Sequence, residues 1–267
     1  MLLLGVLVPS PSVLALRKSS ENLGVPPWPT PRERGSYRVR LAATGKPLWD
    51  VTWETTVTQN GGQTQVQIHE QGHGQPLHYK EPIVWDKRMF LLTAPVVQVR
   101  SLEGSRFTQD GKLLSRMEVQ VDPRRRLLLY KDTGQGGSPT GTSLPWTPQT
   151  LPDEFLFHWV RTLNFNQSLA QEFFLVVSPT RRIRMRAFVR GRETLTTPAG
   201  TFSCYRVELL PYLGPLEIFP LKTLVPKLTL WCALDPPHFW VRYQGPVGGP
   251  GSPQAIIELM SFQRTAA

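Results

Sequence analysis

The chain has 267 residues, of which 40% are hydrophobic and 10% aromatic, and this composition excludes an intrinsically disordered protein. Its 26 prolines and 21 glycines favour many turns over long helices. The formal net charge is +10, and 22 of the 30 basic residues are arginines. An anionic partner such as nucleic acid, a lipid headgroup or an acidic polysaccharide would fit this charge, although a GC-rich genome also produces an arginine-rich balance.

The N-terminal residues 1–15 combine an apolar run with a small-residue cleavage site, as in a secretory signal. Residues 16–35 are rich in proline and charge and predict an extended linker. No apolar stretch reaches the roughly 20 residues of a membrane-spanning helix, and no cysteine near the cleavage site could carry a lipid anchor. We therefore expect an exported bacterial protein, periplasmic or extracellular, that does not span the membrane and has one β-rich domain over residues 36–264.

The chain contains two cysteines, Cys204 and Cys232, and both fall in predicted strands. In an oxidising compartment, an even number of cysteines favours a disulfide. Two buried free thiols are the alternative, because a bridge requires the two Cα atoms to lie within about 7 Å of each other. The sequence leaves both arrangements open.

The first predicted strand covers residues 49–57, where apolar and polar side chains alternate with a period of two. The pair Asn60-Gly61 follows and is the strongest short signal for a β-hairpin. A two-residue loop at this pair predicts a register in which Trp53 faces Ile68 on the returning strand. One face of the hairpin is then apolar and buried.

The segment HEQGH, residues 69–73, matches the H-E-x-x-H signature of zinc metalloproteases. That signature needs its histidines one helical turn apart. Here the segment continues the predicted strand, where His69 and His73 share a face but lie about 13 Å apart at roughly 3.3 Å per residue. Gly72 and Pro76 also oppose a helix. We therefore predict no catalytic zinc site and no cofactor; an adventitious metal site in a loop is the alternative.

A long loop is predicted over residues 132–152, which are rich in Gly, Pro, Ser and Thr. The one predicted helix follows in residues 151–165, with Thr150 and Asp153 as a capping box. We expect His158 in this helix to be a satisfied core or rim residue and not a ligand. The helix carries an apolar stripe that should pack on a sheet, formed by Phe155, Leu156, Trp159, Val160 and Leu163.

Arginines alternate with apolar residues in RRIRMRAFVR, which predicts a strand with one apolar face and one arginine face. Like charges at alternate positions repel each other, so a partner that neutralises them would be favourable. Acidic groups on neighbouring strands are the alternative source of neutralisation. The arginines of this face are Arg182, Arg184, Arg186 and Arg190.

Four features of the second half of the chain occur together: a helix with an arginine, a strand ending in Gly-Arg-Glu, a Thr-Pro-Ala-Gly-Thr-Phe turn and a hairpin that begins with tryptophan. They are Arg161, Gly191-Arg192-Glu193, Thr197–Phe202, and Trp231 with Val241. This pattern resembles the exported bacterial family known as domain of unknown function 3108. The resemblance implies a mainly β fold, a strongly curved antiparallel sheet or open barrel with one packed α-helix, similar to LolA and LolB. It implies no established reaction.

These features favour an exported, non-enzymatic envelope protein that binds an apolar or amphipathic ligand in the concavity of the sheet. A lipid, a lipid-linked glycan or another anionic envelope polymer would be the partner. Ordinary core packing is the alternative for each aromatic residue. The candidate wall residues are Trp49, Trp53, Phe155, Trp159 and Trp231, and the candidates to meet an anionic headgroup are Arg182, Arg184 and Arg186.

Two other functional classes are considered. The first is a structural or interaction module of the cell envelope that docks proteins or polysaccharide and binds no small ligand. The second is a zinc-dependent hydrolase that uses HEQGH, which the strand geometry opposes. Nucleic-acid binding through the arginine face conflicts with export.

Overall fold

The computed structural model describes residues 32–60, 63–93, 97–134, 138–166, 170–212, 214, 227–247 and 251–265. The predicted signal and most of the predicted linker lie outside these residues. In chain order the elements are β1 (Arg32–Leu41), β2 (Pro47–Asn60), β3 (Gln63–Gly74), β4 (Ile83–Leu92), β5 (Gln98–Thr108), β6 (Leu113–Asp122), β7 (Leu127–Gly134), β8 (Thr140–Pro145), β9 (Thr150–Pro152), η2 (Asp153–Phe155), α1 (Leu156–Trp159), η3 (Val160–Thr162), β10 (Gln171–Ser178), β11 (Arg181–Thr197), β12 (Gly200–Pro211), β13 (Leu228–Ala233), β14 (Trp240–Pro246) and β15 (Gln254–Thr265).

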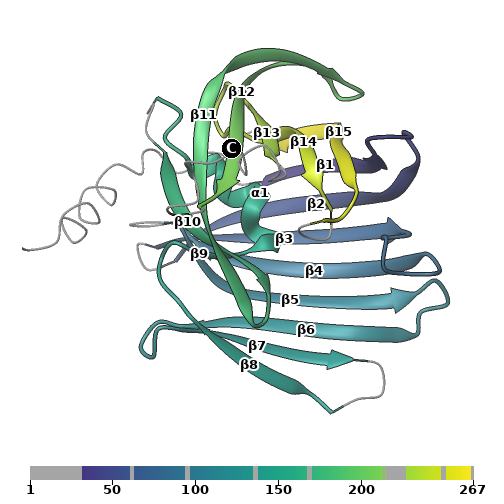
Figure 1. Ribbon diagram of the computed structural model, residues 1–267, viewed down its shortest axis with the longest axis vertical. Helices are drawn as coiled ribbons and strands as arrows, with labels where there is room; N and C mark the ends of the chain where they lie inside the picture. The colour runs from purple at the N-terminus through teal and green to yellow at the C-terminus, as the bar shows by residue number, and fades with distance from the viewer. Residues whose placement is uncertain are drawn as a thin grey trace, which may run out of the picture.

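All 15 strands belong to one sheet, in the order β8-β7-β6-β5-β4-β3-β2-β1-β15-β14-β13-β12-β11-β10-β9. Neighbouring strands are antiparallel except β9 and β10, which are parallel. The sheet does not close, because β8 and β9 form its two edges. Figure 1 shows the sheet curving around α1. The predicted fold class, a mainly β protein with a strongly curved sheet and one packed α-helix, is confirmed, although the helix is short.

The sheet has an inner face, which turns toward the helical segment η2-α1-η3, and an outer face, which turns away from it. Alternate residues of each strand belong to each face. On the inner face, Tyr37 is 3% exposed and Ile68 is fully buried. Phe157 of α1 stacks on Trp240 of β14 with the ring centroids 4.4 Å apart. Removal of this apolar surface from water, at roughly 25 cal/mol per Å², is the main force that holds the sheet around the helical segment.

The β2–β3 hairpin contains the predicted strands in a different register. Trp53 lies opposite Glu70, two residues beyond the predicted partner Ile68, and Asn60 is paired with Gln63. The prediction had placed the loop at the Asn-Gly pair itself. Because side-chain direction repeats every two residues, a shift of two leaves the same side chains on the inner face.

The prediction of a long loop over residues 132–152 is wrong, because these residues include the end of β7 and all of β8 and β9. The Thr-Gly-Thr-Ser sequence of β8 mixes strand-favouring threonines with glycine and serine, which are common in loops, and antiparallel pairing with β7 makes it a strand. Likewise, β1 begins at Arg32, inside the predicted linker, because it pairs with both β15 and β2. Pairing with a neighbouring strand overrides local composition in both places.

The predicted helix is present, but it is divided into η2, α1 and η3. Thr150 does not cap it: Thr150 lies in β9, and its hydroxyl accepts a hydrogen bond from the Thr147 amide (3.0 Å). Pro152 occupies the N-cap position without a side-chain hydrogen bond. His158 is buried as predicted, but its Nδ1 lacks a hydrogen-bond partner among the described residues. The apolar stripe does pack in the core, with Phe155, Leu156, Val160 and Leu163 buried and Trp159 half-buried.

The Thr-Pro-Ala-Gly-Thr-Phe segment forms the turn between β11 and β12, in which Thr197 pairs with Gly200. Gly200 has a φ of +132°, a conformation that residues with a side chain rarely adopt. Phe202 returns to the core and meets Phe239 edge-on, with centroids 5.6 Å apart. The segment therefore shapes a hairpin, as its sequence predicts.

Cys204 and Cys232 are free thiols, and both are fully buried. They lie on neighbouring strands, where Cys204 pairs with Ala233 and Tyr205 pairs with Cys232. Because consecutive residues of a strand point to opposite faces, the two sulfur atoms leave the sheet on opposite sides. Burial raises the pKa of the Cys204 thiol to about 12. Of the two arrangements left open by the sequence, the structure has the unbridged one.

Candidate functional site

Four of the five aromatic residues predicted to line a ligand cavity belong to the hydrophobic core. Phe155 is fully buried, and Trp53 is 6% exposed. Trp49 and Trp159 are half-buried and pack against the same core. Trp159 meets Phe173 of β10 with ring centroids 4.3 Å apart. Contacts within the protein are therefore sufficient to explain the positions of these four rings.

The fifth aromatic residue, Trp231, lies apart from the others on the outer face. Its partner across the β12–β13 pair is Arg206, and its partner across the β13–β14 pair is Arg242. The indole Nε1 donates a hydrogen bond to Glu193 (2.9 Å). Trp231 thus belongs to a charged row of the outer face and does not share a wall with Phe155.

The arginines predicted to meet an anionic headgroup have partners within the protein. Arg184 forms an ion pair with Glu172 on the neighbouring strand (2.6 Å). Arg182 and Arg186 each lie over the aromatic ring of a nearby residue, at 4.6 Å and 5.5 Å from the ring centroid. Neighbouring side chains therefore supply contacts for all three, and for Arg184 the contact is an acidic group on a neighbouring strand, as in the alternative considered for this strand.

The HEQGH segment lies in β3, as predicted, with its consecutive side chains on opposite faces. On the outer face, the His69 Nε2 atom lies 2.7 Å from Asp86 Oδ2. On the inner face, Glu70 forms an ion pair with Lys87 (3.2 Å). His73 follows on the outer face, four residues further along the strand. Within the described parts of the chain, no group of three His, Cys, Asp or Glu side chains could hold a metal ion.

The glycine of the HEQGH segment has a packing role. A Cβ atom on Gly72 would lie 2.1 Å from the indole of Trp85, its partner on β4. Only a residue without a side chain leaves room for this ring, which also meets Trp49 edge-on and donates to Glu70 (3.3 Å). The motif is therefore explained by the packing of a strand.

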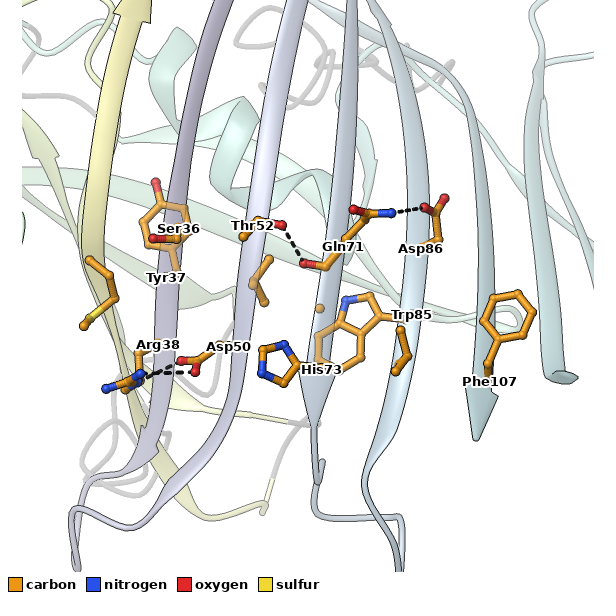
Figure 2. Close-up of a pocket in the computed structure, with 14 residues that line it drawn as sticks. Ser36, Tyr37, Arg38, Asp50, Thr52, Gln71, His73, Trp85, Asp86 and Phe107 are labelled. Carbon is orange, nitrogen blue, oxygen red and sulfur yellow. Dashed lines mark hydrogen bonds and ion pairs between the residues drawn. The ribbon is translucent and has the colours of Figure 1, made fainter. Parts of the chain in front are cut away.

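The outer face is hollowed where β15 and β1 to β5 lie side by side (Figure 2). One hollow has a volume of about 650 Å³, and a second of about 360 Å³ shares Ser36, Thr52 and Gln71 with it. We call the two together the outer trough. Its lining comprises Arg34, Gly35, Ser36, Tyr37, Arg38, Asp50, Val51, Thr52, Trp53, Glu54, His69, Gln71, Gly72, His73, Val84, Trp85, Asp86, Phe107, Met260, Ser261 and Gln263.

Pairing across the strands arranges the outward side chains of the trough in two rows. The first row runs through Ser36, Thr52, Gln71 and Asp86 on β1 to β4. The second row runs through Arg38, Asp50, His73, Val84 and Phe107 on β1 to β5. Paired side chains lie about 4.5–5.5 Å apart at their Cβ atoms, so each row is a continuous surface.

Several polar side chains of the trough hydrogen-bond to one another (Figure 2). Arg38 donates to both carboxylate oxygens of Asp50, from Nε (2.8 Å) and from Nη2 (3.2 Å). Gln71 Nε2 donates to Asp86 (2.9 Å), which His69 also contacts. Partial burial opposes the ionisation of Asp86, but the hydrogen bonds from His69 and Gln71 outweigh it and lower the pKa of this carboxyl group. These contacts hold the polar groups in fixed positions.

The second row ends on apolar side chains. Val84 is 39% exposed, and Phe107 beside it is half-buried. On β6, Leu113 pairs with Phe107 and is 45% exposed. We call Val84, Phe107 and Leu113 the apolar rim of the trough.

Apart from Trp53 and the residues of the HEQGH segment, the trough contains residues that the sequence analysis did not single out. The signal was present: on both strands of the β2–β3 hairpin, polar residues occupy every second position opposite the buried face. The pairing of β1 with β15 and of β3 with β4 could not be predicted from the sequence. These pairings bring Met260 and Asp86 to the same surface.

No family model matches the chain, and no curated protein matches it. Among solved structures, it is similar to a presumed exported protein with a YmcC-like fold from Bacteroides fragilis, with 12% identity, a TM-score of 0.35, and coverage of 87% of this chain and 95% of that one. It is also similar to a presumed lipoprotein from Parabacteroides distasonis, with 10% identity, a TM-score of 0.34, and coverage of 88% and 96%. A porin-like protein from Bacteroides uniformis has 9% identity and a TM-score of 0.22, with coverage of 87% and 97%.

TM-scores of this size support no argument about function, and the likeness to domain of unknown function 3108 stays a prediction. In the described ranges, no helix is long and apolar enough to cross a membrane.

Proposed function

We propose that this protein is an exported, non-enzymatic binding module of the bacterial envelope, which holds an extended polar partner in the outer trough. The observation that carries the proposal is the trough itself, where side chains from six adjacent strands face one open hollow of about 650 Å³. An open hollow suits a chain that passes along it, whereas small ligands are usually bound in more enclosed pockets. The apolar N-terminal segment supports export.

The pairing of the trough's polar groups supports a non-enzymatic role. A general acid or base must be able to exchange a proton with its substrate. Asp50 is held by two hydrogen bonds from Arg38, and Asp86 is held ionised by Gln71 and His69. Both carboxylates therefore act best as fixed hydrogen-bond acceptors.

Thr52 lies at the centre of the trough, and Thr52→Trp should fill it. The probe is an immobilised envelope preparation from a bacterial host, and the measurement is the binding of purified protein to it. We expect the parent protein to bind and Thr52→Trp to lose at least tenfold in affinity, because a bulky ring blocks the shared part of both hollows.

Thr58→Trp is the matched control, since Thr58 lies on the same strand and the same face but outside the trough. It should bind as the parent does. Equal binding of Thr52→Trp and the parent, or no binding of the parent, would overturn the proposal. Circular dichroism of each variant establishes that it is folded.

A second candidate function, an amphipathic ligand held on the inner face, is favoured by one observation. Polar groups there contact solvent: Lys87 and Glu70 have side chains 21% and 19% exposed. Asp153 also contacts solvent, but the partial removal of water by the surrounding protein, together with the neighbouring Glu154, raises the pKa of its carboxyl group well above the usual range. Charged groups in this position, beside the apolar interior, are suited to contact a polar headgroup.

Shortening Trp159, which is half-buried in the helical segment, tests this second function. If a ligand lies on the inner face, Trp159→Ala should reduce the fluorescence of a bound apolar probe several-fold while the protein stays folded. Trp231→Ala, on the outer face, should leave the probe signal unchanged. Probe binding that is the same in a folded Trp159→Ala protein and in the parent would contradict an inner-face ligand.

A further inference from the structure

We infer that the partner of the outer trough is an uncharged oligosaccharide chain. The inference rests on the proposed function and specifies the chemistry of its ligand. Three properties of the trough carry it: its charge, the hydrogen-bonding capacity of its fixed side chains, and its position in the middle of a sheet with an apolar rim at one end.

The charge of the trough differs from that of the whole chain. The chain has a formal net charge of +10. The trough, in contrast, is lined by two arginines, Arg34 and Arg38, and by three carboxylates, Asp50, Glu54 and Asp86. Arg38 is committed to Asp50, and Arg34 donates to Gln263 (2.7 Å). Arg32, beside the trough, pairs with Glu54, so each carboxylate has a partner on the outer face and the trough carries no excess of positive charge that would attract an anionic polymer.

The fixed polar groups retain hydrogen-bonding capacity. A guanidinium group has five N–H donors, and Arg38 uses two of them on Asp50. A carboxylate offers about four lone-pair sites, and two of those on Asp86 are taken by His69 and Gln71. The Thr52 hydroxyl donates to the backbone oxygen of Gln71 (3.4 Å) and keeps its own lone pairs free to accept. Sugar hydroxyl groups also donate and accept, so they can use both kinds of remaining capacity without breaking an ion pair.

The position of the trough disfavours an extended peptide. Peptides that add to a sheet bind along an exposed edge, where backbone N–H and C=O groups are unpaired. The trough lies over β1 to β5, and each of these strands is paired on both sides. A ligand there meets side chains only, which suits hydroxyl-rich chains.

The dimensions and the apolar rim also fit an oligosaccharide. Strands lie about 4.8 Å apart, so the trough from β1 to β5 spans about 19 Å, enough for several linked sugar units. At the β5 end, Phe107 and Val84 offer apolar surface. The C–H face of a sugar ring packs well against such surface, and aromatic residues often supply much of the binding energy at an interface.

Titration calorimetry with soluble glycans tests the inference. The neutral probes are dextran and cellulose oligosaccharides, and the anionic probes are hyaluronate and heparin, each at low and high salt. We expect a neutral probe to bind with an affinity that salt changes less than twofold, because no ion pair is formed. Thr52→Trp should abolish binding, Phe107→Ala should weaken it roughly fivefold to tenfold, and Thr58→Trp should leave it unchanged.

The outcomes distinguish this inference from the proposed function. Binding only to anionic probes, with a steep loss at high salt and dependence on Thr52, would overturn the oligosaccharide and leave the trough as a binding site. If Thr52→Trp still binds a neutral probe as the parent does, the outer trough is not the binding site, and the proposed function is overturned as well. Absence of binding to every neutral probe would also overturn the inference. If Thr52→Trp fails to fold, the binding of Phe107→Ala is compared with that of Thr58→Trp. Weaker binding in Phe107→Ala alone supports the trough as the site, and equal binding in both variants contradicts it.

Discussion

Replacement of Arg161 by methionine should lower the free energy of unfolding by about 3–5 kcal/mol, because it leaves a buried carboxylate without its main partner. Arg161 in η3 and Glu33 in β1 form an ion pair (2.8 Å) in which the side chains are 2% and 0% exposed. Arg161 also donates to the backbone oxygen of Pro237 (3.0 Å). Arg264 also contacts Glu33, but at 3.9 Å and with a side chain that is 34% exposed, so it stabilises the carboxylate less than Arg161 does. Urea unfolding followed by tryptophan fluorescence measures the change.

The control is Arg184→Met, which removes an ion pair whose side chains are 41% exposed. Exposed pairs contribute about 0–1 kcal/mol, so this variant should remain close to the parent. The double variant Glu33→Met/Arg161→Met should recover most of the lost stability, since it removes both charges together. A loss below about 1 kcal/mol in Arg161→Met alone would contradict the burial of this pair.

The parent protein should lose stability as the pH falls below about 6.5, and His158→Leu should remove part of this loss. Burial, with the nearby charges of Arg161 and Lys87, lowers the pKa of His158 to about 3. An unfolded histidine has a pKa near 6.5, so below that pH the unfolded chain binds a proton that the folded chain excludes. The cost grows by at most about 1.4 kcal/mol per pH unit and stops growing near the folded pKa.

Between pH 6.5 and pH 5 the difference between the parent and His158→Leu should change by about 1.6 kcal/mol, the parent losing more. Above pH 7.5 this histidine makes no pH-dependent contribution, and the two curves should run parallel. Urea unfolding at a series of pH values gives both curves. Curves that remain parallel down to pH 5 would mean that His158 can take up its proton without unfolding.

The alternation of side chains predicted much of the fold, but the pairing of distant strands could not be predicted from it. Period-two patterns correctly identified the buried face of β2 and the strand character of HEQGH. The predicted register of β2 on β3 was wrong by two residues, because a turn signal reflects only the local sequence and does not depend on the strands that pair on either side. β8 was missed because an edge strand with small polar residues differs little from a loop in composition.

The candidate site was harder to predict than the fold. Aromatic residues were expected to line a cavity, but large apolar side chains are equally suited to a core, and Phe155 and Trp53 are buried there. The outer trough is formed by side chains that carry no distinctive signal when each is considered alone in the sequence. Arg38, Asp50 and His73 become a surface only when three strands lie in register, which no local pattern specifies.

The pairing of β1 with β15 has a consequence for the order in which the chain can fold. All other pairs of neighbours in the sheet are consecutive strands, and most of them are joined by short connections. The β1–β15 pair instead joins Arg32 to Thr265, across nearly the whole described chain. Loop closure over such a separation is entropically costly and slows folding. The two halves of the sheet can therefore form separately, and the pairing of β15 with β1 then joins them.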